Sequence, residues 1–230
     1  MALSGEYNPL DYGNLTKNCV QELMGRGPYP LPPATSFEKA GVYALFYTGN
    51  AEAYAPFRSP DASRPIYVGK AVPAGARKGR KADAPNSRKR KKASPPDTPL
   101  FGRLREHAAS IRAVENLALD DFLCRYLVVT PLWITMSERF LIEHYRPLWN
   151  VWLDGFGNHD PGKNRSTEIS WWDALHPGRT SNWKAAIQVT KTREEAEERV
   201  RAFLDLPAQD LEQLALEAME AEDGDEGGTV

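Results

Sequence analysis

Two short apolar runs, each carrying a tyrosine and each closed by a glycine, constrain the fold of this chain most strongly. The runs are GVYALFY at 41–47, with a glycine at 49, and PIYVG at 65–69. β-Branched and aromatic residues bounded by turn residues are typical of strands, so both runs are predicted to be strands. The 17 residues between them are too many for a tight hairpin and predict an expanded loop. In an antiparallel pair, Tyr43 and Tyr67 become neighbours on one face of the sheet.

A helix is predicted after the long loop that follows the second strand. Thr98 is a suitable cap residue, and Pro99 suits the first helical position. Arg103 and His107 are four residues apart, so they share one flank of this helix, at the rim of its apolar stripe. That stripe has helical spacing and consists of Leu100, Leu104, Ala108 and Ile111.

A third strand and a second helix complete a β-β-α-β-α frame. FLCRYLVVT at 122–130 is heavily apolar and predicts the strand. TMSERFLIEHYRPLWN at 135–150 predicts the helix, which Pro147 ends before Asn150 begins a new segment. A carboxylate in line with an apolar stripe needs a partner, and Glu138 shares one helix face with Leu141, Ile142 and Tyr145.

The charge distribution points to nucleic acid. The formal net charge of the 230 residues is −2, but residues 64–112 carry 14 Lys or Arg against 3 Asp or Glu. A local basic cluster of this kind is the electrostatic signature of nucleic-acid binding. The chain has no run of 18 apolar residues and no signal peptide, so neither a membrane span nor secretion is expected. Cys19 and Cys124 lie in no metal-binding spacing and fit a reducing cytoplasm.

Four regions are expected along the chain. They are an N-terminal extension 1–36, a core 37–155 with a basic insertion 72–97, an accessory Trp-rich segment 156–190, and an acidic helical tail 191–230 with a disordered end. The insertion holds 9 Lys or Arg against 2 acids, and a loop of this length is rarely kept without a use, which favours DNA contact over a solvated insertion. The acidic tail either solubilises the chain or competes with DNA for the basic insertion.

The elements taken together resemble the GIY-YIG nuclease superfamily. The resemblance rests on GVY and YVG in successive strands, Arg-x-x-x-His on a helix, and ERFLIEHYRPLWN. From about residue 30 to residue 180, GVYALFYTG, PIYVGKAVPAG, REH, PLWN, DGFGNHDPG and HPGR are similar to type II restriction endonucleases of this superfamily that cut the palindrome CCGCGG. The implied fold is α/β (α+β): a GIY-YIG catalytic core with a three-stranded antiparallel sheet flanked by helices, plus inserted loops and a C-terminal helical extension.

The resemblance implies a role for each polar residue of the frame. Tyr43 is the general base or its relay, although a phenol titrates near pH ~10 and needs nearby positive charge to act near neutrality. His107 or Lys70 supplies that charge or takes the proton. Arg103 grips the scissile phosphate in the transition state, and Tyr67 orients the nucleophile or the phosphate.

A divalent metal ion is implied as well. Glu138 is its ligand, with Mg²⁺ expected and Mn²⁺ as a substitute, and the ion stabilises the leaving 3′ oxygen. Asn150 fixes the end of the Glu138 helix or a water beside the metal. The expected products carry 5′-phosphate and 3′-hydroxyl ends.

The expected partner is double-stranded DNA, bound by a homodimer because a palindrome calls for a two-fold protein. A methyltransferase is expected to be encoded alongside, not bound, and no membrane is expected. Phosphate contacts give affinity and arginine–guanine pairs give specificity. The candidate DNA-binding residues are Arg64, Arg77, Lys78, Arg80, Lys81, Arg88 and Arg90.

Simpler interpretations stay open for the same residues. Thr135-x-x-Glu138 matches a helix capping box, the Arg–His pair fits a solvated helix flank, the two tyrosines fit ordinary core aromatics, and Lys70 fits a surface lysine. For the chain as a whole, the alternatives are a repair or mobile-element nuclease of the same superfamily, or a nuclease-derived DNA-binding protein that no longer cuts.

Overall fold

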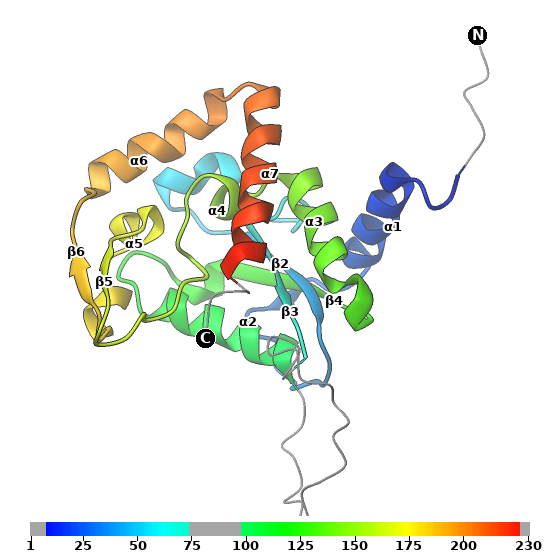
Figure 1. The fold of residues 1–230 in the computed structure, drawn as a ribbon, viewed down its shortest axis with the longest axis horizontal. Helices are drawn as coiled ribbons and strands as arrows, with labels where there is room; N and C mark the ends of the chain where they lie inside the picture. The colour runs from blue at the N-terminus through cyan, green and yellow to red at the C-terminus, as the bar shows by residue number, and fades with distance from the viewer. Residues whose placement is uncertain (1–7, 74–97, 226–230) are drawn as a thin grey trace, which may run out of the picture.

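The computed structural model describes residues 8–73 and 98–225, and Figure 1 shows a mixed arrangement of helices around one main sheet. The helices are α1 Tyr12–Met24, α2 Pro99–Arg112, α3 Ile134–Tyr145, α4 Leu148–Val151, α5 Trp171–Leu175, α6 Arg193–Ala202 and α7 Ala208–Asp225. The strands are β1 Tyr29–Pro30, β2 Gly41–Tyr47, β3 Tyr67–Ala71, β4 Phe122–Val128, β5 Ser166–Glu168 and β6 Ala186–Gln188. Short 3₁₀ turns are η1 Glu52–Phe57, η3 Leu119–Asp121, η4 Pro131–Trp133, η5 Arg179–Asn182 and η6 Phe203–Asp205.

The main sheet is antiparallel with strand order β1-β4-β2-β3. β2 is central and fully buried, which explains why its sequence is apolar on both faces. The predicted span of β2 is confirmed. β3 runs two residues further than predicted, because Lys70 and Ala71 pair with Val42 and Gly41 at the start of β2. Lys70 therefore lies in a strand and not in the loop that follows it.

The sheet has a fourth strand that the sequence analysis did not predict. The two-residue β1, from the Pro/Gly-rich segment, pairs with β4 through Tyr29 opposite Cys124. Its position at the end of the strand order suits Pro30, because proline lacks the N–H that an inner strand needs.

Helices α2 and α3 lie on opposite sides of strands β2 and β3 (Figure 1). The four-residue apolar stripe predicted for α2 is completely buried, as expected. Thr98 is the N-cap residue and Pro99 begins the helix, as predicted, but within the described residues the Thr98 side chain accepts no capping hydrogen bond. α3 begins at Ile134 after Trp133, so Thr135 lies inside the helix and the capping-box interpretation of Glu138 is wrong.

The C-terminal segments belong to the packed body of the protein. The short strands β5 and β6 pair in parallel, and α7 packs against α3 and α4, burying Ala215 and Met219. α7 continues to Asp225, so residues 222–225, predicted to be disordered, are helical; residues 226–230 lie outside the described residues. α1 is longer than the predicted helix around residues 17–24 and is capped by Asp11. No helix of the described residues is both long and apolar enough to span a membrane.

Candidate active site

A tyrosine from β2 and a histidine from α2 form the centre of the candidate site. Tyr43 Oη lies 2.5 Å from Nε2 of His107, and both side chains are buried. Burial, followed by the charges of Arg103 and other cations, holds the pKa of His107 well below its ordinary value, so the imidazole is neutral near pH 7. The rim position predicted for His107 is therefore corrected: this side chain lies fully inside.

Tyr67 and Arg103 complete this cluster. The ring of Tyr67 lies 6.2 Å from that of Tyr43 and edge-on to His107 at 5.3 Å, as antiparallel pairing of the two strands predicted. Burial alone would lower the pKa of Arg103, but the neighbouring hydroxyls of Tyr43 and Tyr67, together with Glu106, raise it overall. The guanidinium is therefore held as a cation beside two phenols.

Arg103 is oriented by three acceptors. It donates from NH1 to Glu106 Oε2 at 2.9 Å and from NH2 to the Gly157 carbonyl at 3.2 Å, and NH1 lies 2.5 Å from His159 Nε2. Two of these partners come from the segment after α4, far from α2 in sequence. His159 thus contacts the arginine expected to hold phosphate.

The glycine that closes the second strand motif provides space for the phenol of the first. Tyr43 pairs with Gly69 across β2 and β3. A Cβ at position 69 would lie 2.4 Å from Tyr43 Oη and 2.6 Å from Cζ, closer than real atoms approach. A side chain at this position would displace the hydroxyl from His107.

A second, separate pair lies on the other side of β3. Lys70 Nζ and Glu138 Oε2 are 2.8 Å apart, and both side chains are largely buried. Successive strand residues point to opposite faces, so Lys70 faces α3 while Gly69 and Tyr67 face α2. Six of the seven predicted residues thus form two groups, one on each side of strand β3, which stands at the end of the strand order.

Asn150 connects α4 to that same strand. Its Oδ1 accepts from Val68 N–H and its Nδ2 donates to Val68 C=O, both at 2.8 Å. The side-chain amide thus makes the two bonds that a neighbouring strand would make. The expectation that Asn150 fixes the end of the Glu138 helix is wrong, because its partner is β3.

The donor set suits a magnesium ion held by one protein carboxylate. Among residues 8–73 and 98–225, no group of three or more His, Cys, Asp or Glu side chains is placed to hold a metal. Mg²⁺ commonly binds through one or two carboxylates, keeps several waters and takes substrate phosphate oxygens as further ligands. Glu138 is such a buried carboxylate, so it fits Mg²⁺ held by a single protein ligand. Within the described residues, a site with three or more such protein ligands is absent.

Of the seven predicted DNA-binding residues, only Arg64 falls within the described residues. It is exposed and its guanidinium lies 5.5 Å from the ring centre of Phe57. The other predicted contacts lie outside the described residues, and they are Arg77, Lys78, Arg80, Lys81, Arg88 and Arg90.

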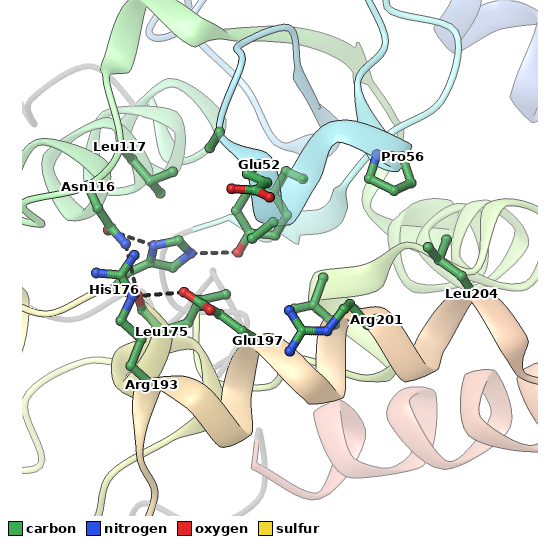
Figure 2. Close-up of a pocket in the computed structure, with 14 residues that line it drawn as sticks. Glu52, Pro56, Asn116, Leu117, Leu175, His176, Arg193, Glu197, Arg201 and Leu204 are labelled. Atoms are coloured by element: carbon green, nitrogen blue, oxygen red, sulfur yellow. Dashed lines mark hydrogen bonds and ion pairs between the residues drawn. The ribbon is translucent and has the colours of Figure 1, made fainter.

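A second tyrosine–histidine pair lies away from these groups, beside a pocket of about 550 Å³ (Figure 2). Tyr54 Oη lies 2.5 Å from His176 Nε2, whose Nδ1 lies 2.8 Å from Asn116 Oδ1. Asn116 donates from Nδ2 to the carbonyl of Leu175, and Trp149 Nε1 donates to Tyr54 Oη. Burial, and then the charges of two arginines, lowers the pKa of His176 to about 3.

The hydrogen-bond directions in this second network follow from its ends. Because Asn116 Nδ2 donates, its Oδ1 accepts from His176 Nδ1–H, and Nε2 is left to accept the proton of Tyr54. The pKa of Tyr54 is held well above its ordinary value, and burial is the largest cause of this shift. The network is thus a fixed chain of neutral donors and acceptors. No local pattern in the sequence indicates this network, because Tyr54 and His176 are 122 residues apart.

Comparison with known proteins identifies a family for this chain. The family model described as the Eco29kI GIY-YIG domain matches residues 35–204, which include both groups of the candidate site. At the level of whole proteins, no curated protein matches the chain significantly. The matched span covers well over half of the 230 residues. The chain therefore belongs to the family of the Eco29kI GIY-YIG domain, a family of GIY-YIG restriction endonucleases.

Proposed function

We propose that this protein is a type II restriction endonuclease that hydrolyses duplex DNA at a G·C-rich palindrome, CCGCGG, with Mg²⁺ as its metal ion. The observation that carries the proposal is the arrangement around strand β3. A phenol, an imidazole and a guanidinium meet on one side, and a carboxylate paired with a lysine lies on the other. Family membership supports nuclease chemistry on DNA; the site, the metal and the ends of the products are proposed.

The proton transfer runs through the first group. A water attacking phosphorus gives its proton to Tyr43 Oη as the proton of Tyr43 passes to His107 Nε2, 2.5 Å away. The neighbouring cation Arg103 favours the phenol oxygen while it carries charge. Its planar fork also suits two phosphate oxygens, whose negative charge grows in the transition state.

The second group serves the leaving oxygen. Glu138 would hold Mg²⁺, which supplies positive charge at the 3′ oxygen when bound. Lys70, 2.8 Å from Glu138, keeps the buried carboxylate ionised and oriented until phosphate arrives. The departing 3′ oxygen takes a proton from solvent water, which leaves a 5′-phosphate and a 3′-hydroxyl, and two copies of the chain on a palindrome cut both strands.

Plasmid cleavage tests the proposal. A plasmid with one CCGCGG site is incubated with protein and Mg²⁺, beside the same plasmid with one base pair of the site changed. Linear product from the first plasmid alone, with ends that a ligase rejoins, supports the proposal. Cutting of both plasmids would instead indicate a repair or mobile-element nuclease, and binding without cutting would indicate a DNA-binding protein that has lost its activity.

A matched pair of variants tests the proposed metal ligand. Glu138→Gln should lower cleavage by about 10²–10³-fold while retaining DNA binding measured in Ca²⁺. Glu143→Gln, on the same helix and bonded to Tyr12, is the control and should cleave normally. Equal cleavage by the two variants would exclude Glu138 as the ligand. Sedimentation of the protein with and without site DNA tests the proposed homodimer.

A further inference from the structure

The segment DGFGNH at 154–159, here called the 154–159 loop, forms one wall of the candidate site. Phe156 is buried, and its ring stacks on His107 with centres 4.7 Å apart and planes 16° from parallel. The same ring meets Tyr67 edge-on at 5.0 Å. The next residue, Gly157, accepts a hydrogen bond from Arg103. Groups from β3 and α2 therefore share contacts with one short loop.

Gly157 leaves the space that this contact needs. A Cβ at this position would lie 3.0 Å from Tyr67 Oη and 3.4 Å from Arg103 NH2. The loop backbone is thus closely fitted to two side chains of the site. A shift of the loop would therefore move the side chains of both Tyr67 and Arg103.

A buried ion pair holds the loop in place. Arg179 donates from Nε and NH2 to the two oxygens of Asp173, at 2.9 and 2.7 Å. The same guanidinium donates from NH2 to the Gly155 carbonyl at 2.9 Å and from NH1 to the Phe156 carbonyl at 2.7 Å. Arg179 is 6% exposed and Asp173 is 3% exposed, so this clamp lies inside the protein.

Further contacts fix the clamp itself. Ser170 caps α5 by accepting from Asp173 N–H, and its hydroxyl donates to Asp173 Oδ2 at 2.7 Å. Gly155 has a φ of +109°, and a Cβ there would lie 2.0 Å from Ser170 Oγ. The Arg179 guanidinium also lies 4.5 Å from the ring centre of Trp172. The backbone on either side of Phe156 is therefore held from several directions.

We propose that Phe156 is a positioning residue for His107, and that the Arg179–Asp173 ion pair is the clamp that holds Phe156 against the imidazole. The proposal rests on the nuclease function proposed above, since His107 is taken to receive the proton from Tyr43. A buried ion pair adds little net stability when apolar residues of similar volume can replace it, but its fixed geometry sets the place of the loop. A misplacement of about 1 Å in a reacting group costs on the order of 10²-fold in rate.

Phe156→Leu tests the positioning role, with Phe57→Leu as the matched control. Both phenylalanines are buried, at 1% and 4% exposure, and Phe57 packs against Phe203 instead of the candidate site. Phe156→Leu should lower kcat by on the order of 10²-fold with KM unchanged, while Phe57→Leu should cleave like the wild type. A KM effect alone, or equal kcat in the two variants, would overturn the proposal.

The clamp needs a variant that does not leave one buried charge unpaired. Changing Asp173 or Arg179 alone does so and risks unfolding. The double variant Asp173→Leu/Arg179→Met removes both charges, and its fold is checked by circular dichroism and thermal melting. It should fold and show the same kcat loss as Phe156→Leu, and adding Phe156→Leu should cause no further loss, because both changes act through one contact. A folded double variant with wild-type kcat would refute the clamp.

A second readout separates this proposal from the nuclease proposal. The chain has 4 histidines, so imidazole resonances in an NMR spectrum are few, and His107→Gln identifies the one of interest. The His107 signal should move in Phe156→Leu, which removes the stacked ring, and in the double clamp variant, which displaces it, and stay in place in Phe57→Leu. If the wild type cleaves no DNA, the nuclease proposal fails, and an unmoved His107 signal in the clamp variant refutes the positioning proposal independently.

Discussion

The chain contains two buried tyrosine–histidine contacts of the same 2.5 Å length, Tyr43–His107 and Tyr54–His176. In both, burial is the largest cause that lowers the histidine pKa. Their phenols differ in their surroundings. Burial, the Trp149 hydrogen bond and the electrostatic influence of Tyr47 set the pKa of Tyr54, and no cation is among these causes, whereas the Tyr43 hydroxyl interacts electrostatically with the Arg103 cation.

This difference supports a structural role for the Tyr54 pair and the proposed chemical role for the Tyr43 pair. The Tyr54 pair ends in an amide and a backbone carbonyl, so each proton has a fixed place. The Tyr43 pair stands beside a cation that favours the charged form of the phenol. The distance between tyrosine and histidine alone would not have distinguished the two pairs; the neighbouring cation does.

The largest expected effect is on cleavage. Tyr43→Phe should lower the rate by about 10²–10⁴-fold, the range for losing a general acid–base group. Tyr54→Phe, which removes the same atom from the other pair, should cleave at close to the wild-type rate when compared below its melting temperature. Initial rates on a plasmid substrate measure both. Similar losses in the two variants would remove the functional distinction between the pairs.

The next effect is on stability, and it concerns the Tyr54 pair. Tyr54→Phe leaves two buried groups, His176 Nε2 and Trp149 Nε1, without their hydroxyl partner. An unsatisfied buried group costs about 1–3 kcal/mol, so the free energy of unfolding in urea should fall by at least that amount. Tyr47→Phe is a control and should cost less, since its hydroxyl accepts a hydrogen bond from the nearby, part-buried Ala51 N–H. An unchanged urea midpoint in Tyr54→Phe would show that water replaces the lost hydroxyl.

Acid should destabilise the fold through His176. Its pKa is about 3 when folded and near 6.5 when unfolded, so the unfolded chain binds the proton first as the pH falls between these values. Stability is therefore complete above about pH 6.5 and declines toward pH 3, by up to about 1.4 kcal/mol per pH unit for this group. His176→Gln should show a shallower fall of melting temperature from about pH 6 to about pH 4. An unaltered slope would place the acid sensitivity elsewhere, with His107 as the first alternative.

The smallest effect on cleavage is expected for Glu106, the carboxylate that bonds Arg103. Glu106 is 55% exposed and bonds Arg103 from three residues away on the same helix. Exposed ion pairs contribute about 0–1 kcal/mol, and Gly157 also holds the guanidinium. Glu106→Gln should therefore change the cleavage rate by a factor of about 5 or less. A loss as large as that of Tyr43→Phe would mean that Glu106, and not the loop backbone, orients Arg103.

Local patterns in the sequence were sufficient for the frame of the fold. The apolar run of β2 and the buried stripe of α2 are visible over a few residues, so strand and helix could be assigned from them. Antiparallel pairing of the strands also predicted Tyr43 beside Tyr67, whereas the resemblance to the GIY-YIG superfamily was needed to place His107 in the same site. The extent of β3 was harder to predict, since Lys70 joins the strand only through its partner Val42 on β2.

The clamp and the second pair could not be predicted in this way. Phe156 lies in a glycine-rich loop with no periodicity, and its carbonyl bonds Arg179, 23 residues later. Such partners come together only in the packed fold of the sheet and α5. The DGFGNHDPG and HPGR motifs pointed to the right segments, but residue types alone did not reveal that one segment supports the other.

The carboxamide of Asn150 has a consequence for self-association. Strand edges with vacant peptide groups act as templates onto which a second chain can add, and proteins protect them. By taking both peptide groups of Val68, this side chain blocks one docking point on the outermost strand. A single polar residue thus helps to keep two copies of the chain from joining through their sheets.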